Sequence, residues 1–206
     1  AKDCIFTVDD FAPSGSPNDV SRLHREADRL LRGQGNRAGR TRMRSDGSLQ
    51  AENYPRGMIV SSGEDIPKGH SLRARTVIIE LTNGDIDLDI LTQAQKDSAA
   101  EIFSQSVSGY IQWIAPQIDS LKSSLVGRKQ ELREQARKSE FAHDRTPDIV
   151  SSLIIGWESF LDYALFGKAI TESMKKELFD RGWKAITETS KAQASHQLNE
   201  EPAARF

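Results

Sequence analysis

Short apolar runs bounded by polar turns dominate the first part of the chain. Three of them, at residues 4–11, 57–60 and 76–81, are rich in β-branched and aromatic side chains. Unbroken apolar runs of this length are typical of strands buried on both faces of a parallel sheet. The pattern therefore predicts three strands, and it predicts that the thiol of Cys4 packs within the sheet.

A helical period separates the first two predicted strands. Ser16 can cap a helix that Pro17 opens, and Gly33 and Gly35 are expected to end it. Its apolar positions recur three and four residues apart and are Val20, Leu23, Ala27, Leu30 and Leu31. The first part of the chain is therefore expected to be α/β.

From residue 87 onward the pattern is helical. Predicted helices begin at Thr92, Thr146 and Thr171, and Pro116 breaks the first of them. Three tryptophans fall among their apolar positions and are interpreted as core anchors: Trp113, Trp157 and Trp183. The sequence thus predicts an α/β part, residues 1–88, followed by an all-α helical bundle, residues 89–206.

Composition adds few constraints. The 206 residues are 37% hydrophobic and 28% charged with a net charge of −2, which is ordinary for a soluble globular protein. Bulk charge therefore gives no argument for a nucleic acid or a membrane. The single cysteine excludes an internal disulfide framework and suits a reducing, cytoplasmic location. No run approaches the roughly 18 apolar residues of a membrane span.

Polar side chains stand at the carboxyl ends of the first two predicted strands, the edge at which open α/β sheets bind ligands. Asp9 and Asp10 close the first strand, and Ser61, Ser62 and Glu64 follow the second. In P-loop ATPases the first acid of such a pair holds the nucleotide's Mg²⁺ and the second polarises the attacking water. Hydroxyls on the next strand can orient that water or contact the terminal phosphate. Solvated aspartates and a simple Ser/Gly turn explain the same residues without any chemistry.

Arginines are concentrated between these two strands. Eight arginines against two acids between Arg22 and Arg44 give a local balance of 8 − 2 = +6. Residues 45–48 predict a tight turn within a small hairpin. An Arg-rich loop after an Arg-faced helix is a candidate contact for a phosphate backbone, and a solvated surface is the alternative. The candidate nucleic-acid-binding residues are Arg32, Arg37, Arg40, Arg42 and Arg44.

Two further arginines, Arg73 and Arg75, precede the third predicted strand. If this segment is extended, their side chains point the same way. Arginines in this position can act as arginine fingers that reach a nucleotide across a subunit boundary. The alternative is a pair of surface arginines that form ion pairs with Glu64 or Glu80.

These motifs occur in a fixed order: VDDFAP at 8–13, RLHREA at 22–27, QGNR at 34–37, RGMIVSSGED at 56–65 and SLRAR at 71–75. In this order they resemble the ATPase domain of large primase/helicase-type proteins of bacterial plasmids, prophages and integrative elements. The resemblance continues more weakly through residues 84–88 and 109–113 and around Trp157 and Trp183. It implies a partial RecA/AAA-like parallel-sheet core, allied to the ring helicases of viral replication initiators, followed by the helical bundle.

The resemblance also implies roles for the candidate residues. Asp9 would hold Mg²⁺ and Asp10 would act on the water. Ser61 or Ser62 would be the sensor, with Glu64 as a further catalytic candidate, and Arg73 or Arg75 would be the finger. The implied cofactors are ATP and Mg²⁺. The implied partners are single-stranded or forked DNA and further copies of the chain in a ring, with no membrane.

The chain departs from the family pattern in two ways. The second acid of the pair is usually Glu, and Asp10 is one methylene shorter. No Gly-x-x-x-x-Gly-Lys-Ser/Thr motif occurs in the sequence, so the phosphate-binding loop is expected upstream of these residues.

Two hypotheses about function follow. The first is an ATP-driven nucleic-acid motor, a helicase or replication-initiation ATPase of a mobile genetic element. The second is a non-enzymatic DNA-binding or oligomerisation module with relic ATPase features. A metabolic enzyme finds no support, because no catalytic His, Cys or Lys residues cluster in the sequence. A zinc site is rejected because neither His24 nor His143 has a second ligand at metal-binding spacing.

Overall fold

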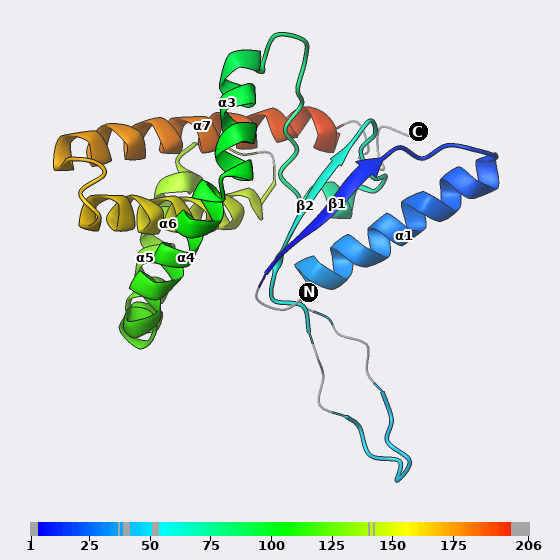
Figure 1. Cartoon of the computed structure of the whole chain (residues 1–206). Coiled ribbons are helices and arrows are strands. Elements are labelled where there is room, and N and C mark those ends of the chain that lie inside the picture. The colour runs from blue at the N-terminus through cyan, green and yellow to red at the C-terminus, as the bar shows by residue number, and fades with distance from the viewer. Residues whose placement is uncertain are drawn as a thin grey trace. The chain divides into compact units, whose positions relative to one another are not determined.

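The computed structural model describes residues 4–36, 38, 42–50, 54–139, 141 and 143–198 (Figure 1). The chain divides into two compact units, one formed by the residues up to Thr76 and from Ser195, the other by Val77–Ala194. A parallel sheet of two strands with one helix is followed by a mostly helical region of five helices. The expected order, α/β first and all-α second, is confirmed at this level.

The first unit is built on a β-α-β arrangement. Strands β1 (Ile5–Phe11) and β2 (Met58–Gly63) pair in parallel, and helix α1 (Pro17–Gly35) lies between them in the chain (Figure 1). A short helix, α2 (His70–Arg73), follows. Parallel pairing places the carboxyl ends of β1 and β2 at the same edge of the sheet, which is where the candidate residues were expected.

Helix α1 begins as its sequence predicts. The Ser16 hydroxyl accepts the backbone N–H of Asp19, and the Asp19 carboxylate accepts the backbone N–H of Ser16, which completes a capping box ahead of Pro17. The helix ends at Gly35, one of the two glycines expected to end it, and runs through the other, Gly33. One glycine inside a helix lowers its stability without ending it.

The prediction that the strands are buried on both faces is wrong. Ile5 is 66% exposed, Met58 is 53% exposed and Val60 is 49% exposed. Cys4 is also exposed, so its thiol is not packed as expected. Two strands and one helix cannot cover both faces of a sheet, and apolar strand residues therefore remain in contact with solvent.

Two glycines allow the strands to approach each other closely. A Cβ on Gly63 would lie 2.6 Å from the carbonyl oxygen of Phe11, well inside contact distance. A Cβ on Gly57 would collide with the carbonyl oxygen of Cys4. The pairing of β1 with β2 therefore depends on glycine at both ends of β2.

The helical elements of the chain are α3 (Leu88–Ala99), α4 (Ile102–Ile114), the 3₁₀ turn η1 (Ala115–Gln117), α5 (Ile118–Arg137), α6 (Thr146–Phe166) and α7 (Glu172–Leu198). Buried Leu132 and Ala136 of α5 meet buried Val150 and Ile154 of α6. Trp183 packs against this core, as expected of an anchor. The Arg128 guanidinium donates to both carboxylate oxygens of Glu158, at 3.0 and 2.7 Å, and joins α5 to α6.

The other two tryptophans are half-buried in aromatic contacts. Trp157 donates from Nε1 to the carbonyl oxygen of Leu178, at 3.0 Å, and its ring stacks on Phe160. The ring centroids of Trp113 and Tyr163 lie 5.8 Å apart. The Trp157 hydrogen bond joins α6 to α7, and the contact of Trp113 with Tyr163 joins α4 to α6.

The predicted strand at residues 76–81 is wrong, because no strand occurs there. Ile78 instead exchanges two hydrogen bonds with the Gln193 side chain: its N–H donates to Oε1 at 3.2 Å, and its carbonyl accepts from Nε2 at 2.7 Å. A strand requires a neighbouring strand, and a single side-chain amide cannot provide a ladder.

The first helix of the second unit also begins earlier than predicted. Asp87 caps it by accepting the N–H groups of Asp89 and Ile90, so α3 starts at Leu88 rather than at Thr92. The predicted break at Pro116 is confirmed by η1. An additional break occurs at Glu101, whose φ is +61°.

Helix α6 is the one helix in the described part of the chain that is long and apolar enough to cross a bilayer, judged by length and composition alone. The core helices of globular proteins pass the same test. Val150, Ile154 and Leu161 of α6 are buried in this structure. The feature therefore gives weak support for a membrane span.

Candidate functional site

The carboxyl ends of β1 and β2 bring three of the predicted residues together. The Ser62 hydroxyl donates to Oδ1 of Asp9. The same hydroxyl oxygen accepts the backbone N–H of Asp10, at 3.0 Å. Ser62 therefore bridges the two aspartates, and this contact joins positions 52 and 53 residues apart in the chain.

The bridge lies at an irregularity of the sheet. Val8 pairs with Ser61 and Phe11 pairs with Gly63, so Asp9 and Asp10 together face the single residue Ser62. This is the geometry of a β-bulge, a feature common beside active sites. The backbone of Asp10 takes a φ of +57°, in the left-handed region that Asp tolerates better than most residues.

Ser61 and Glu64 are held differently. The Ser61 hydroxyl donates to the carbonyl oxygen of Ser62, at 3.3 Å, and does not take part in the bridge between the aspartates. Glu64 donates its backbone N–H to the carbonyl oxygen of Phe11, at 3.2 Å, and is exposed to solvent. Of the two serines, Ser62 is the one that the structure brings to the paired acids.

The sequence analysis considered His24 only as a zinc ligand and did not predict that it is buried on α1. Its ring stands edge-on to Phe11 with the centroids 5.5 Å apart. Its Nε2 lies 3.7 Å from Oδ2 of Asp65, in the loop after β2. The available signal was its spacing, because Val20, His24, Ala27 and Leu31 recur at helical intervals on one face.

The basic segment forms the expected hairpin where it can be described. Met43 and Leu49 form an antiparallel bridge, and the N–H of Arg44 donates to the carbonyl oxygen of Ser48, at 2.8 Å. Arg42 and Arg44 are exposed on it. Arg37 and Arg40 lie outside the described residues.

The turn of this hairpin is held by Asp46. The Ser48 hydroxyl and its backbone N–H both donate to Oδ1 of Asp46, at 2.7 and 2.9 Å. These hydrogen bonds lower the pKa of the Asp46 carboxyl, so the group is ionised at neutral pH. Gly47 takes a φ of +80°, which suits a tight turn.

Arg32 belongs to an ion pair within α1. Its Nε donates to both carboxylate oxygens of Asp28, at 2.8 and 2.9 Å. The pair offsets part of the positive charge that the sequence assigns to this helix. Arg32 is therefore a weaker phosphate candidate than the exposed arginines of the hairpin.

Arg73 and Arg75 do not lie on an extended segment, so the condition under which their side chains would point the same way is not met. Residues 70–73 form α2, and a turn follows it. Nε of Arg73 donates to the carbonyl oxygen of Pro67, at 3.4 Å, and Nε of Arg75 donates to Oδ1 of Asn36, at 3.2 Å. Buried Leu72 and Ala74 alternate with them and hold this short helix in place.

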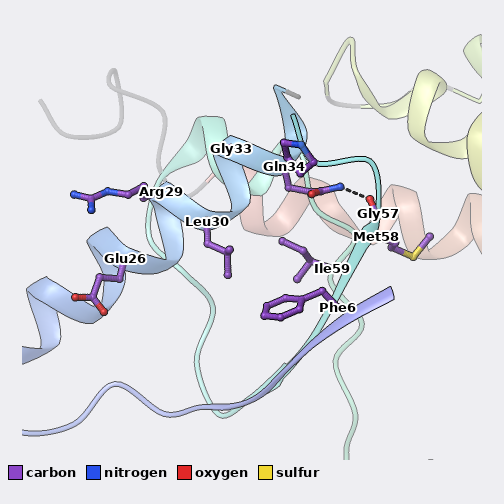
Figure 2. A pocket seen from close by; sticks show the side chains of 10 residues that line it. Phe6, Glu26, Arg29, Leu30, Gly33, Gln34, Gly57, Met58 and Ile59 are labelled. Carbon is purple, nitrogen blue, oxygen red and sulfur yellow. Dashed lines mark hydrogen bonds between the residues drawn. The ribbon is translucent and has the colours of Figure 1, made fainter. Parts of the chain in front are cut away.

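A pocket of about 440 Å³ lies between α1 and the beginning of the strands. Figure 2 shows the side chains of Phe6, Leu30 and Ile59 converging in it, with Glu26 and Arg29 extending from α1 at its edge. Its lining is mainly apolar, so it suits a hydrophobic group. The pocket lies at the starting end of the strands, whereas Asp9 and Ser62 lie at the carboxyl end.

The donor set at the strand ends suits Mg²⁺ bound mostly by water and substrate. Among the residues that the structure describes, no group of three or more His, Cys, Asp and Glu side chains could hold a metal ion. Mg²⁺ usually keeps several waters and binds through one or two carboxylates together with phosphate oxygens. One exposed carboxylate at Asp9, beside a hydroxyl, fits that mode and does not fit an all-protein cage.

Comparison with known proteins gives no family assignment. A scan against protein-family models and searches of curated proteins and of solved structures found no match to this chain.

Proposed function

We propose that the chain forms part of an ATP-driven nucleic-acid motor, with Mg²⁺ held at Asp9. The observation that carries the proposal is the Ser62 bridge between Asp9 and Asp10 at the paired ends of two parallel strands. Residues chosen from sequence as an acid pair and a sensor hydroxyl are thereby in contact across the sheet. The resemblance to primase/helicase-type ATPase domains supports the same assignment.

The roles of the three residues follow from their positions. Asp9 would supply one carboxylate ligand, and the bound Mg²⁺ would neutralise charge on the phosphate oxygens of ATP. Asp10 would accept a proton from the attacking water, and the bulge holds its backbone in place for that task. The Ser62 hydroxyl would report the state of the terminal phosphate by exchanging its bond to Asp9 for one to the phosphate.

The hairpin supports a nucleic-acid partner. Arg42 and Arg44 are exposed on either side of Met43, on a hairpin whose turn is already ordered by Asp46 and Ser48. Because the turn is already ordered, binding a phosphate costs the hairpin less backbone freedom, and the planar guanidinium loses less freedom per hydrogen bond than an ammonium group does. Single-stranded or forked DNA is the partner we propose, bound through its backbone.

The finer fold that we propose is a RecA/AAA-like core completed by further strands. The apolar side chains exposed on β1 and β2 support further helices packed on the sheet, because parallel sheets are normally covered by helices on both faces. The chain contains no P-loop motif, so the proposed hydrolysis requires a phosphate-binding loop from another segment. Arg73 or Arg75 would act on the nucleotide of a neighbouring copy in a ring.

The test is ATP hydrolysis by the chain joined to a P-loop segment of its parent gene, with and without single-stranded DNA. Turnover that rises with DNA and disappears in Asp9→Ala supports the motor and places Mg²⁺ at Asp9. A folded protein that binds DNA and shows no turnover contradicts the enzymatic proposal.

The second candidate is a non-enzymatic DNA-binding and oligomerisation module. It is favoured by the surface of α4, where Phe103, Val107 and Ile111 are each at least 50% exposed. No charged residue occurs between positions 102 and 118. An apolar, uncharged helix face is typical of contacts between protein subunits and would not attract a phosphate backbone.

A further inference from the structure

His24 is the one buried residue of α1, although it is polar. Its side chain is 8% exposed. Within the part of the chain that the structure describes, neither Nδ1 nor Nε2 has a hydrogen-bond partner. Leaving a buried polar group unpaired costs about 1–3 kcal/mol, so its presence requires a physical reason.

The imidazole touches the ends of both strands that carry the candidate site. Its ring contacts Phe11, which directly follows Asp10 in the bulge of β1. Its Nε2 lies 3.7 Å from Oδ2 of Asp65, just after β2. That separation exceeds a hydrogen bond by less than 1 Å, so a small shift of α1 would form the bond.

The same helix carries exposed arginines on its other faces, namely Arg22, which lies 3.6 Å from Asp19, and Arg25 and Arg29. A phosphate backbone bound there would act on α1 as a rigid element. A displacement of α1 would be transmitted to Phe11, at the end of β1, through the contact of that ring with His24.

We propose that His24 is a positioning residue that couples nucleic-acid binding on α1 to cation binding at Asp9. This inference rests on the proposed function. When α1 binds a phosphate backbone, His24 closes onto Asp65 and its ring fixes Phe11. The bulge containing Asp9 and Asp10 is then held in the arrangement that receives Mg²⁺. By linkage, Mg²⁺ at Asp9 tightens nucleic-acid binding by the same factor.

The experiment uses the 206-residue chain and a fluorescein-labelled oligothymidine strand. The dissociation constant of the complex between the chain and this strand is measured by fluorescence anisotropy, with and without millimolar Mg²⁺ at constant ionic strength. We expect Mg²⁺ to tighten binding about fivefold in the wild-type chain, at the lower end of usual coupling factors. Asp9→Asn should lack this tightening, and any change that Mg²⁺ still causes in that variant measures the screening of phosphates in solution.

Two substitutions at His24 separate positioning from packing. His24→Leu keeps an apolar contact with Phe11 and removes both ring nitrogens. It should bind DNA normally without Mg²⁺ and lose the Mg²⁺ effect. His24→Gln keeps an N–H donor able to reach Asp65 and should restore most of the effect. Ser21→Ala, at an exposed position on α1, is the matched control and should behave as wild type.

Each outcome bears on a different claim. A Mg²⁺ effect that persists in His24→Leu overturns this inference and leaves the proposed function intact. Loss of Mg²⁺-free DNA binding in His24→Leu would mean a purely structural role and also overturns it. If His24→Leu does not fold by circular dichroism, His24→Phe replaces it in the same comparison. Failure of the wild-type chain to bind DNA overturns both the inference and the proposed function.

Discussion

At the scale of single residues, the site depends on one backbone conformation. Asp10 sits at a φ of +57° and donates its N–H to Ser62, and the bulge follows from that arrangement. Left-handed backbone in a side-chain-bearing residue is a conformational cost that commonly persists at functional positions. Sequence shows that two acids end a strand, but it does not show which of them bends the chain.

Replacing Asp10 by glycine tests this conformation. Relief of the left-handed penalty, about 1 kcal/mol, should offset the extra chain entropy that glycine loses, about 0.5–1 kcal/mol. The free energy of unfolding in urea should therefore stay within about 0.5 kcal/mol of wild type. Thr7→Gly, at a position on β1 without positive φ, should lower it by about 1 kcal/mol. If both variants lose the same free energy of unfolding, the left-handed backbone of Asp10 carries no conformational cost.

The close pairing of β1 with β2 requires glycine at position 63. Gly63→Ala places a Cβ 2.6 Å from the carbonyl oxygen of Phe11 and should lower the free energy of unfolding by about 2 kcal/mol. The matched control is Gly127→Ala in α5, where a Cβ would meet no described atom within 4 Å. That variant should gain about 0.5–1 kcal/mol from helix propensity. A neutral Gly63→Ala would mean that β1 and β2 are not paired as described.

At the scale of elements, local sequence signals were reliable and partner-dependent ones were not. The cap of α1 at Ser16, the turn at residues 45–48 and the break at Pro116 each depend on neighbours in the chain, and all three were predictable. The strand expected at 76–81 depends on a second strand, and the described part of the chain supplies none to it. The bridging role of Ser62 and the burial of His24 likewise depend on residues far away in sequence.

The hairpin is the element whose proposed role is most directly testable. Arg42→Ala combined with Arg44→Ala should weaken binding of single-stranded DNA at low salt. The slope of log K against log salt should flatten by about 1.4, because each phosphate contact on a single strand contributes about 0.7. Binding titrations at several salt concentrations measure both quantities.

The control for the hairpin variant removes the same charge elsewhere. Lys122→Ala combined with Lys184→Ala takes away two exposed lysines, whose side chains are 66% and 76% exposed, and should leave the slope unchanged. An unaltered slope in the arginine variant would exclude the hairpin from the interface.

Packing in the helical unit makes a further element-scale prediction. A Cβ on Gly182 of α7 would collide with Nε1 of Trp157, which donates to the carbonyl oxygen of Leu178. Gly182→Ala should therefore cost about 1–3 kcal/mol of stability and alter tryptophan fluorescence. Gly156→Ala on α6 meets no described atom within 4 Å and should be neutral or stabilising. If Gly182→Ala and Gly156→Ala have equal free energies of unfolding, Trp157 does not pack against Gly182 as described.

At the scale of the whole molecule, the sequence predicted an α/β part followed by a helical part, and it overestimated how well the strands are buried. Apolar periodicity reports which side chains favour burial and does not report how many elements are present to cover them. The exposed residues of β1, β2 and α4 share this origin. We propose that further helices cover the surface of β1 and β2 and that another copy of the chain covers the surface of α4.

The α4 surface leads to the prediction that the chain self-associates. Val107 and Ile111 are 57% and 56% exposed, one helical turn apart on a segment without charge. Val107→Glu combined with Ile111→Glu should reduce association by at least tenfold, because two like charges would face each other across a contact between copies.

Val126→Glu, at a 74% exposed position on α5, is the matched control and should associate as wild type. Sedimentation over a range of concentrations measures the effect. A wild-type chain that stays monomeric throughout would remove α4 as an oligomer contact and, with it, the structural support for the non-enzymatic module.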